Sequence, residues 1–146
     1  MSPRRVVVWG AGAWGTALAL HLDRLGNEVH LWVFEPSQYD AMVAQRANPD
    51  FLPGHALPAS IRIFRDLQEA PGGAGVWLSA SPAQTVRALW DAIGPACPPE
   101  ALVISASKGI ERGSLVTPCA IIDSMDSAMR AVACNLDDAN GAPWRW

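Results

Sequence analysis

The stretch that decides the fold is Val6-Val7-Val8-Trp9-Gly10-Ala11-Gly12-Ala13-Trp14-Gly15, near the start of a chain of 146 residues. Its first four residues are apolar and mostly β-branched, which is typical of a parallel strand buried on both faces. The three glycines follow in the pattern G-x-G-x-x-G. From Trp14 onward apolar residues recur at helical spacing. The stretch therefore predicts a strand, a tight turn and the start of a helix.

The residues that follow complete one crossover unit. Leu18, Leu22 and Leu25 continue the apolar helical spacing, and Gly26 predicts a left-handed stop for that helix. A second strand is expected over residues 28–34, ending at Glu35-Pro36. Strand, turn, helix and strand in this order are typical of a parallel sheet.

The rest of the chain predicts three more strands, at residues 61–64, 76–79 and 102–104. Helices are expected at about residues 37–46, from a Ser81-Pro82 cap onward, and from Thr117-Pro118 onward. Residues 48–58 are too rich in proline for a regular helix or strand, and predict an ordered loop or a segment that faces a partner. The apolar stripes of the last two helices are Val86, Leu89, Trp90 and Ile93, and Ile122, Met125, Met129, Val132 and Leu136. We expect an α/β fold of the Rossmann type, a single domain with a doubly wound, mainly parallel sheet in the strand order 3-2-1-4-5.

The glycine motif predicts a dinucleotide site between the first and fourth strands. Gly10 would allow the tight turn, Gly12 would let the backbone approach a pyrophosphate, and Gly15 would let the helix pack closely on the strand. The phosphates would then face the N-terminus of the helix, beside Ala11, Ala13 and Trp14. The alternative is a glycine-rich turn that only packs a helix onto a sheet.

The acidic residue after the second strand bears on the choice of cofactor. Glu35 lies 20 residues after Gly15, where an acid that binds the ribose hydroxyls is expected. A carboxylate repels the additional 2′-phosphate of NADP, so NAD is favoured and NADP is less favoured. Arg46 is the alternative, because its cation could fold back over this edge.

Composition excludes other classes of partner. The chain is 50% hydrophobic and 17% charged with a net charge of −3, so it has no basic field for nucleic acid. Its three cysteines lack metal-ligand spacing, and we expect no bound metal. No apolar stretch is long enough for a membrane span, and a cytoplasmic location is expected.

Four blocks of sequence resemble the NAD-dependent glycerol-3-phosphate dehydrogenases. They are residues 10–19, residues 31–35, Asn48 with residues 51–58, and Ser107-Lys108-Gly109-Ile110-Glu111. The resemblance covers roughly residues 4 to 116. It implies that the glycine turn and Trp14 line the dinucleotide, that Phe34 flanks the adenosine, and that Lys108 lies beside both the cofactor and the substrate. It also implies a role beside the nicotinamide for the step at Pro82, where Ser81 replaces the valine of the family.

The resemblance also implies what the chain lacks. Members of the family continue into a sixth strand and a helical second domain, which supplies a lysine proposed as the catalytic base. Lys108 is the only lysine here, so no complete catalytic set is expected. We expect a dinucleotide-binding domain over residues 1–116, a divergent helix and tail over residues 117–146, and no second catalytic domain.

The function implied by the resemblance is the interconversion of sn-glycerol 3-phosphate and dihydroxyacetone phosphate with NAD(H). Two alternatives stay open: a truncated module that binds NAD without catalysis, and a related hydroxyacid-type dehydrogenase. Without a second domain, an exposed apolar surface would favour a homo-oligomer.

Overall fold

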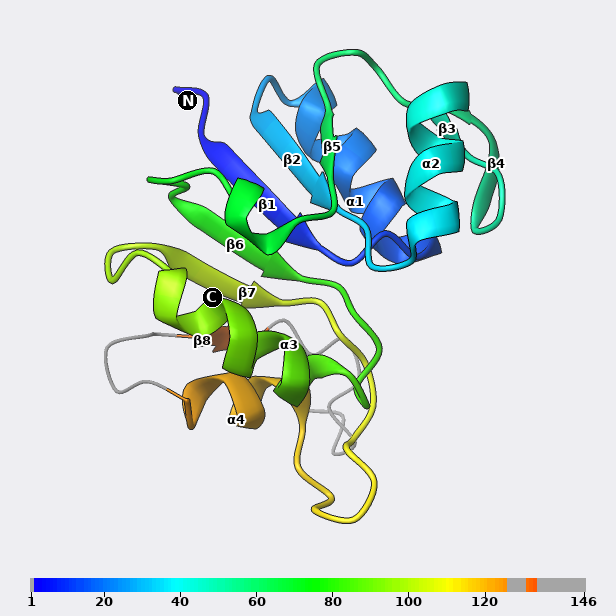
Figure 1. Ribbon diagram of the computed structural model, residues 1–146. Helices are drawn as coiled ribbons and strands as arrows, with labels where there is room; N and C mark the ends of the chain where they lie inside the picture. Colours follow the sequence, from blue (N-terminus) through cyan, green and yellow to red (C-terminus); the bar gives the residue numbers. More distant parts are fainter. Residues whose placement is uncertain (1, 126–130, 134–146) are drawn as a thin grey trace, which may run out of the picture.

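The computed structural model describes residues 2–125 and 131–133. Within these residues one parallel sheet has the strand order β5-β2-β1-β6-β7-β8 (Figure 1). Its strands are β1 (Arg5–Trp9), β2 (Glu28–Trp32), β5 (Arg62–Phe64), β6 (Val76–Ser79), β7 (Leu102–Ser105) and β8 (Ala131–Ala133). The predicted order 3-2-1-4-5 is confirmed for the first five of these, and β8 extends the sheet beside β7.

Helices cover both faces of the sheet. They are α1 (Ala13–Arg24), α2 (Pro36–Gln45), α3 (Val86–Ile93) and α4 (Pro118–Asp123), with short 3-10 turns at η1 (Leu67–Glu69) and η2 (Gly94–Ala96). In Figure 1, α1 and α2 lie on one side of the sheet, and α3 and α4 lie on the other. This is the doubly wound arrangement that the alternation of strands and helices predicts.

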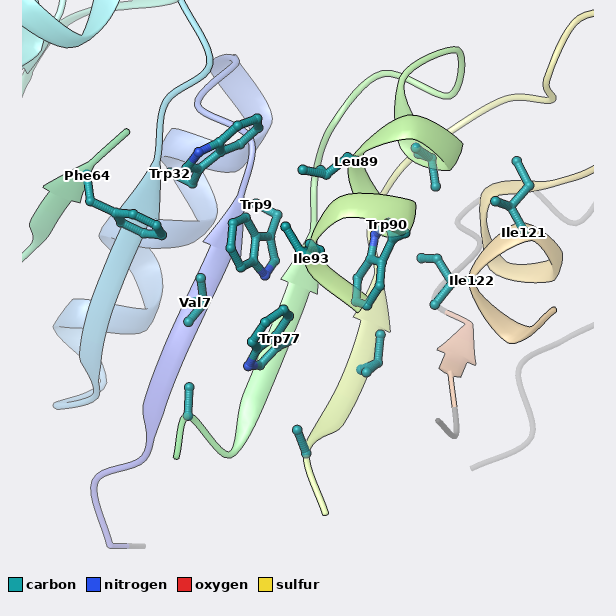
Figure 2. Packing of buried hydrophobic residues seen from close by; sticks show 14 residues of the cluster. Val7, Trp9, Trp32, Phe64, Trp77, Leu89, Trp90, Ile93, Ile121 and Ile122 are labelled. Atoms are coloured by element: carbon teal, nitrogen blue, oxygen red, sulfur yellow. The ribbon is translucent and has the colours of Figure 1, made fainter. Parts of the chain in front are cut away.

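The face under α3 and α4 is packed with aromatic side chains. The Trp9 ring lies 4.9 Å from Trp77 and 5.7 Å from Phe64, measured between ring centroids. Trp90 of α3 packs on Trp77 at 6.1 Å (Figure 2). The predicted stripe of α3 is confirmed, since Val86, Leu89, Trp90 and Ile93 are all buried. Large rings account for much of the area that this core removes from water.

The prediction of an irregular proline-rich loop is wrong in part. Strands β3 (Ala47–Asn48) and β4 (Leu52–Ala56) form an antiparallel hairpin over residues 47–56, which occupies most of that segment. A two-stranded ribbon leaves one side of each strand unpaired, so Pro53 can lie in β4 although it has no N–H to donate.

Two helix boundaries also differ from expectation. Helix α3 begins at Val86 rather than at Pro82, because the N–H and hydroxyl of Thr85 both donate to the Pro82 carbonyl and close a separate turn. Helix α4 ends at Asp123, where the Ser124 hydroxyl donates to the Ile121 carbonyl and competes with continuation of the helix. Val132 lies in β8 instead of that helix, because the edge of β7 offers backbone partners. Met129 and Leu136 lie outside the described residues.

Candidate dinucleotide site

Gly10 and Gly15 are required by close packing at the carboxyl end of β1. Gly10 has φ of +122°, and a Cβ there would lie 2.9 Å from the backbone of Ala80. A Cβ on Gly15 would lie 1.9 Å from the Gly10 carbonyl oxygen. These two positions therefore exclude any side chain, as the expected tight turn and close helix packing require.

Gly12 differs from the other two glycines. It precedes α1 with φ of −71°, and a Cβ placed on it would meet nothing within 4 Å. No side chain caps α1 at this end, and the first N–H groups of a helix have no partner inside it. The space over Gly12 is therefore open, beside backbone donors suited to an anion.

Two amide side chains hold the glycine turn from outside the motif. The Ala11 carbonyl accepts hydrogen bonds from Gln38 Nε2 at 2.6 Å and from Asn48 Nδ2 at 2.8 Å. Asn48 Nδ2 also donates to Thr16 Oγ1 at 2.9 Å. Gln38, Asn48 and Thr16 are all buried. Asn48 belongs to a block that carries the family resemblance, whereas no sequence pattern points to Gln38.

The end of β2 presents the residues predicted to face the adenosine. Phe34 is 69% exposed, and Glu35 is exposed where α2 begins. The neighbouring β5 ends at Phe64, and the carbonyl of the next residue, Arg65, accepts a hydrogen bond from Trp32 Nε1 at 2.9 Å. A pocket of about 390 Å³ opens here between α2 and η1, lined by Tyr39, Arg65, Asp66, Leu67 and Glu69.

Arg46 is directed elsewhere. Its guanidinium donates to the carbonyls of Leu57, Pro58 and Ile61, which ties the end of α2 to the segment after β4. The arginine that lines the pocket is Arg65, to which no sequence pattern points.

The other half of the site lies at the ends of β6 and β7. Ser107 is buried and its hydroxyl donates to the Ser79 carbonyl at 3.4 Å, so the segment after β7 packs against the end of β6. Lys108 follows and is exposed. Pro82 is exposed after β6, while Ser81 is buried and its hydroxyl has no partner among the described residues.

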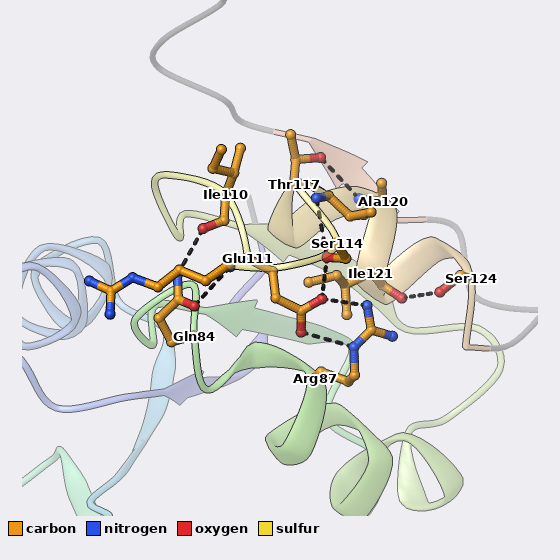
Figure 3. Close-up of polar contacts among 11 residues, drawn as sticks. Gln84, Arg87, Ile110, Glu111, Ser114, Thr117, Ala120, Ile121 and Ser124 are labelled. Carbon is orange, nitrogen blue, oxygen red and sulfur yellow. Dashed lines mark hydrogen bonds and ion pairs between the residues drawn. The ribbon is translucent and has the colours of Figure 1, made fainter.

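Polar contacts fasten the segment after Lys108 (Figure 3). Arg87 makes two hydrogen bonds to the Glu111 carboxylate, at 2.9 and 2.7 Å, and Ser114 Oγ donates to the same group. The hydrogen bonds from Arg87, and then that from Ser114, lower the pKa of Glu111 to about 2. The carboxylate is therefore charged at neutral pH.

One edge of the sheet thus gathers the predicted site. The parallel strands β2, β1, β6 and β7 are neighbours, so their carboxyl ends bring Glu35, the glycine turn, Pro82 and Lys108 to the same edge. Ligands of doubly wound sheets collect at this edge. In the described residues no cluster of metal-ligating side chains occurs, and no helix there is long and apolar enough to cross a membrane.

Comparison with known proteins agrees with this arrangement. The family model described as NAD-dependent glycerol-3-phosphate dehydrogenase N-terminus matches residues 5–134. A Mycobacterium bovis protein named glycerol-3-phosphate dehydrogenase [NAD(P)+] 2 is 43% identical over 135 residues, which are 92% of this chain and 40% of that protein. A Geobacter metallireducens protein named glycerol-3-phosphate dehydrogenase [NAD(P)+] is 40% identical over 113 residues, which are 77% of this chain and 34% of that protein.

A solved structure shows the same relationship in three dimensions. The crystal structure of glycerol-3-phosphate dehydrogenase from Coxiella burnetii superposes with a TM-score of 0.79 at 26% identity, over 90% of this chain and 39% of that one. This chain therefore spans about 40% of the length of the curated relatives that it matches first. From the match over residues 5–134, the chain belongs to the family of NAD-dependent glycerol-3-phosphate dehydrogenases, as their N-terminal part.

Proposed function

We propose that this chain binds NAD at the glycine turn and forms the cofactor-binding part of an enzyme that interconverts sn-glycerol 3-phosphate and dihydroxyacetone phosphate. The observation that carries the proposal is the contrast at the turn. At Gly10 and Gly15 the protein's own backbone occupies the space that a side chain would need, whereas Gly12 faces open space at the N-terminus of α1. A turn that only packed a helix onto a sheet would not need a glycine at Gly12.

The proposal assigns each part of the edge a role. The pyrophosphate lies on the backbone of residues 10–15 beside Trp14, and the adenosine lies by Phe34 with its ribose hydroxyls on Glu35. Pro82 and Lys108 lie on the nicotinamide side, and Lys108 also contacts the substrate. The Glu35 carboxylate makes NAD the favoured cofactor over NADP.

The proposal also includes the domain bounds and the cellular location of the protein. We place the main part of the dinucleotide-binding domain at residues 1–116, with α4 and β8 of a divergent following segment packed onto the same sheet. We place the protein in the cytoplasm, in glycerol 3-phosphate and carbohydrate metabolism. Self-association would cover exposed apolar side chains such as Leu115, which is 71% exposed.

Hydride transfer needs a group that takes the proton of the substrate hydroxyl. Lys108 is the only lysine of the sequence and is assigned to binding, so a module that binds NAD without turnover is the second candidate. Calorimetry with NAD, together with NADH oxidation in the presence of dihydroxyacetone phosphate, separates the two. Binding with turnover supports the enzyme, and binding alone supports the silent module. A folded sample that binds neither NAD nor NADP would overturn both.

The variant Gly12→Ala tests the site itself. Its methyl group meets open space, so we expect an unchanged melting temperature, but it occupies the position where the pyrophosphate would approach, so NAD binding should be lost. Gly75→Ala is the matched control, because Gly75 also has open space around its Cβ position and lies before β6, at the opposite edge. Retention of NAD affinity by Gly12→Ala would contradict the assignment of the pyrophosphate.

A further inference from the structure

The loops that follow β6 and β7 are joined by one glutamine side chain. Gln84 Nε2 donates to the Ile110 carbonyl at 2.8 Å, and Gln84 Oε1 accepts from the Arg112 N–H at 2.9 Å. A single amide therefore bonds to the backbone on both sides of Glu111, as Figure 3 shows. Such a pair of bonds fixes the distance between the two loops.

A second connection reaches the same loop from helix α3. Arg87 binds Glu111 through both of its carboxylate oxygens, and the Glu111 side chain is only 15% exposed. Two-point guanidinium–carboxylate pairs fix orientation as well as distance. We call Gln84, Arg87 and Glu111 the brace.

Lys108 lies between the brace and a second anchor. On one side Ser107 is buried against the end of β6. On the other side, after Gly109 with its φ of +97°, the backbone of Ile110 and Arg112 is hydrogen-bonded to Gln84 of the brace. The backbone at Lys108 is therefore held at both ends, while its side chain is exposed and makes no ion pair with the described residues.

The order of the strands indicates which half of a dinucleotide this loop would meet. Glu35 follows β2 on one side of β1, whereas Lys108 follows β7 on the other side. With the pyrophosphate over β1 and the adenosine by Glu35, the nicotinamide half extends toward β6 and β7. This step rests on the proposed function.

We propose that the brace positions Lys108 for the nicotinamide half of the cofactor. Gln84, Arg87 and Glu111 are positioning residues and make no contact with the cofactor themselves. They hold the backbone on which the flexible lysine stands, so that less conformational freedom is lost when its ammonium group binds.

The test compares NADH with ADP, which carries the adenosine and both phosphates but lacks the nicotinamide riboside. In the variant Gln84→Met we expect about five- to tenfold weaker NADH binding by calorimetry, as for loss of about one hydrogen-bonded contact, and unchanged ADP binding. Lys108→Met should show the same pattern. The double variant should bind NADH no more weakly than Lys108→Met alone, because a brace without its lysine has nothing to position. Gln45→Met is the matched control, since Gln45 is exposed at the far end of α2.

Arg87→Met provides a second, independent variant of the brace, with the same expected pattern. Additive losses in the double variant, equal losses for ADP and NADH, or full NADH affinity in both brace variants would overturn the inference. Failure of the unaltered protein to bind both ADP and NADH would instead overturn the proposed function.

Discussion

Glu35 is the residue whose charge should decide between the two dinucleotides. It is exposed at the start of α2, and the N–H of Tyr39, which lines the pocket together with Arg65, Asp66 and Glu69, donates to the Glu35 carbonyl. Repulsion by a carboxylate is a common way to reject a phosphate. We expect Glu35→Gln to raise NADP affinity by about tenfold and to lower NAD affinity by less, as measured by calorimetry.

Arg65 supplies the matched comparison for that prediction. Adding Arg65→Ala to Glu35→Gln should remove much of the gain for NADP, because Arg65 is the cation beside this pocket. A Glu35→Gln variant with an unchanged ratio of NAD to NADP affinity would show that the ribose lies elsewhere.

Single residues were predictable from the sequence where a local rule governs them. Gly10 and Gly15 follow from a turn and a close approach within five residues of each other. Gln38 and Gln84 were missed because their partners, Ala11 and Ile110, lie 27 and 26 residues away. No spacing rule connects such pairs, and only the fold brings them together.

At the scale of elements, the β3–β4 hairpin is joined to the glycine turn by Asn48. Asn48→Ala removes two buried hydrogen bonds and should lower the free energy of unfolding by about 1–3 kcal/mol, measured by urea denaturation. NAD affinity should fall as well, because the Ala11 carbonyl loses one of its two amide partners.

Asn27 offers a control for that element. Its side chain makes two hydrogen bonds, to the Leu22 carbonyl and from the Arg4 N–H, at the opposite edge of the sheet, whereas the Asn48 side chain makes the two described above and accepts a third from the Phe51 N–H. Asn27→Ala should destabilise the fold while leaving the affinity for NAD unchanged. Equal effects of both variants on NAD binding would argue against a specific link from the hairpin to the turn.

The type of each helix or strand could be predicted from the sequence more often than its first and last residues. The strand β1 has a fully apolar run from Val6 to Trp9, and β2, β6 and β7 have mostly apolar runs, as burial on both faces of a parallel sheet requires. The α3 stripe was predicted correctly, but its start was not, because Pro82 and Thr85 form a turn of their own. Beyond Asp123, the helical spacing of apolar residues predicted a longer helix. Ala131–Ala133 instead pair with β7, whose outer side offers backbone partners.

At the scale of the whole molecule, ion pairs fasten both edges of the sheet. At the amino ends of the strands, Arg5 of β1 binds Glu28 of β2 at 2.9 Å, and His30 Nε2 lies 3.0 Å from the same carboxylate. At the carboxyl ends, Arg87 binds Glu111. The hydrogen bond with His30, and then that from Arg5, lower the pKa of Glu28, as those from Arg87 and Ser114 lower the pKa of Glu111.

The lowered pKa values of Glu28 and Glu111 both make the folded chain less stable at acidic pH. A carboxyl group whose pKa is lower in the folded chain binds fewer protons there than in the unfolded chain. The contribution of such a carboxylate to the free energy of unfolding is complete when the pH is above 4.5, the pKa in the unfolded chain. It is lost as the pH falls toward the pKa in the folded chain, which is about 2 for Glu111. The free energy of unfolding should therefore decrease on acidification through this range.

Glu111→Gln isolates one of the two carboxylates in that response. The variant should be less stable than the unaltered chain at pH 6, and the difference should shrink between pH 5 and pH 3 as Glu111 becomes protonated in the unfolded chain. Urea denaturation followed by circular dichroism at each pH measures it, with Glu100→Gln as the control for neutralising an exposed glutamate that has no ion pair among the described residues. A difference that stays constant from pH 6 to pH 3 would mean that the Arg87–Glu111 pair does not stabilise the fold through its charge, and the brace would then act through its geometry alone.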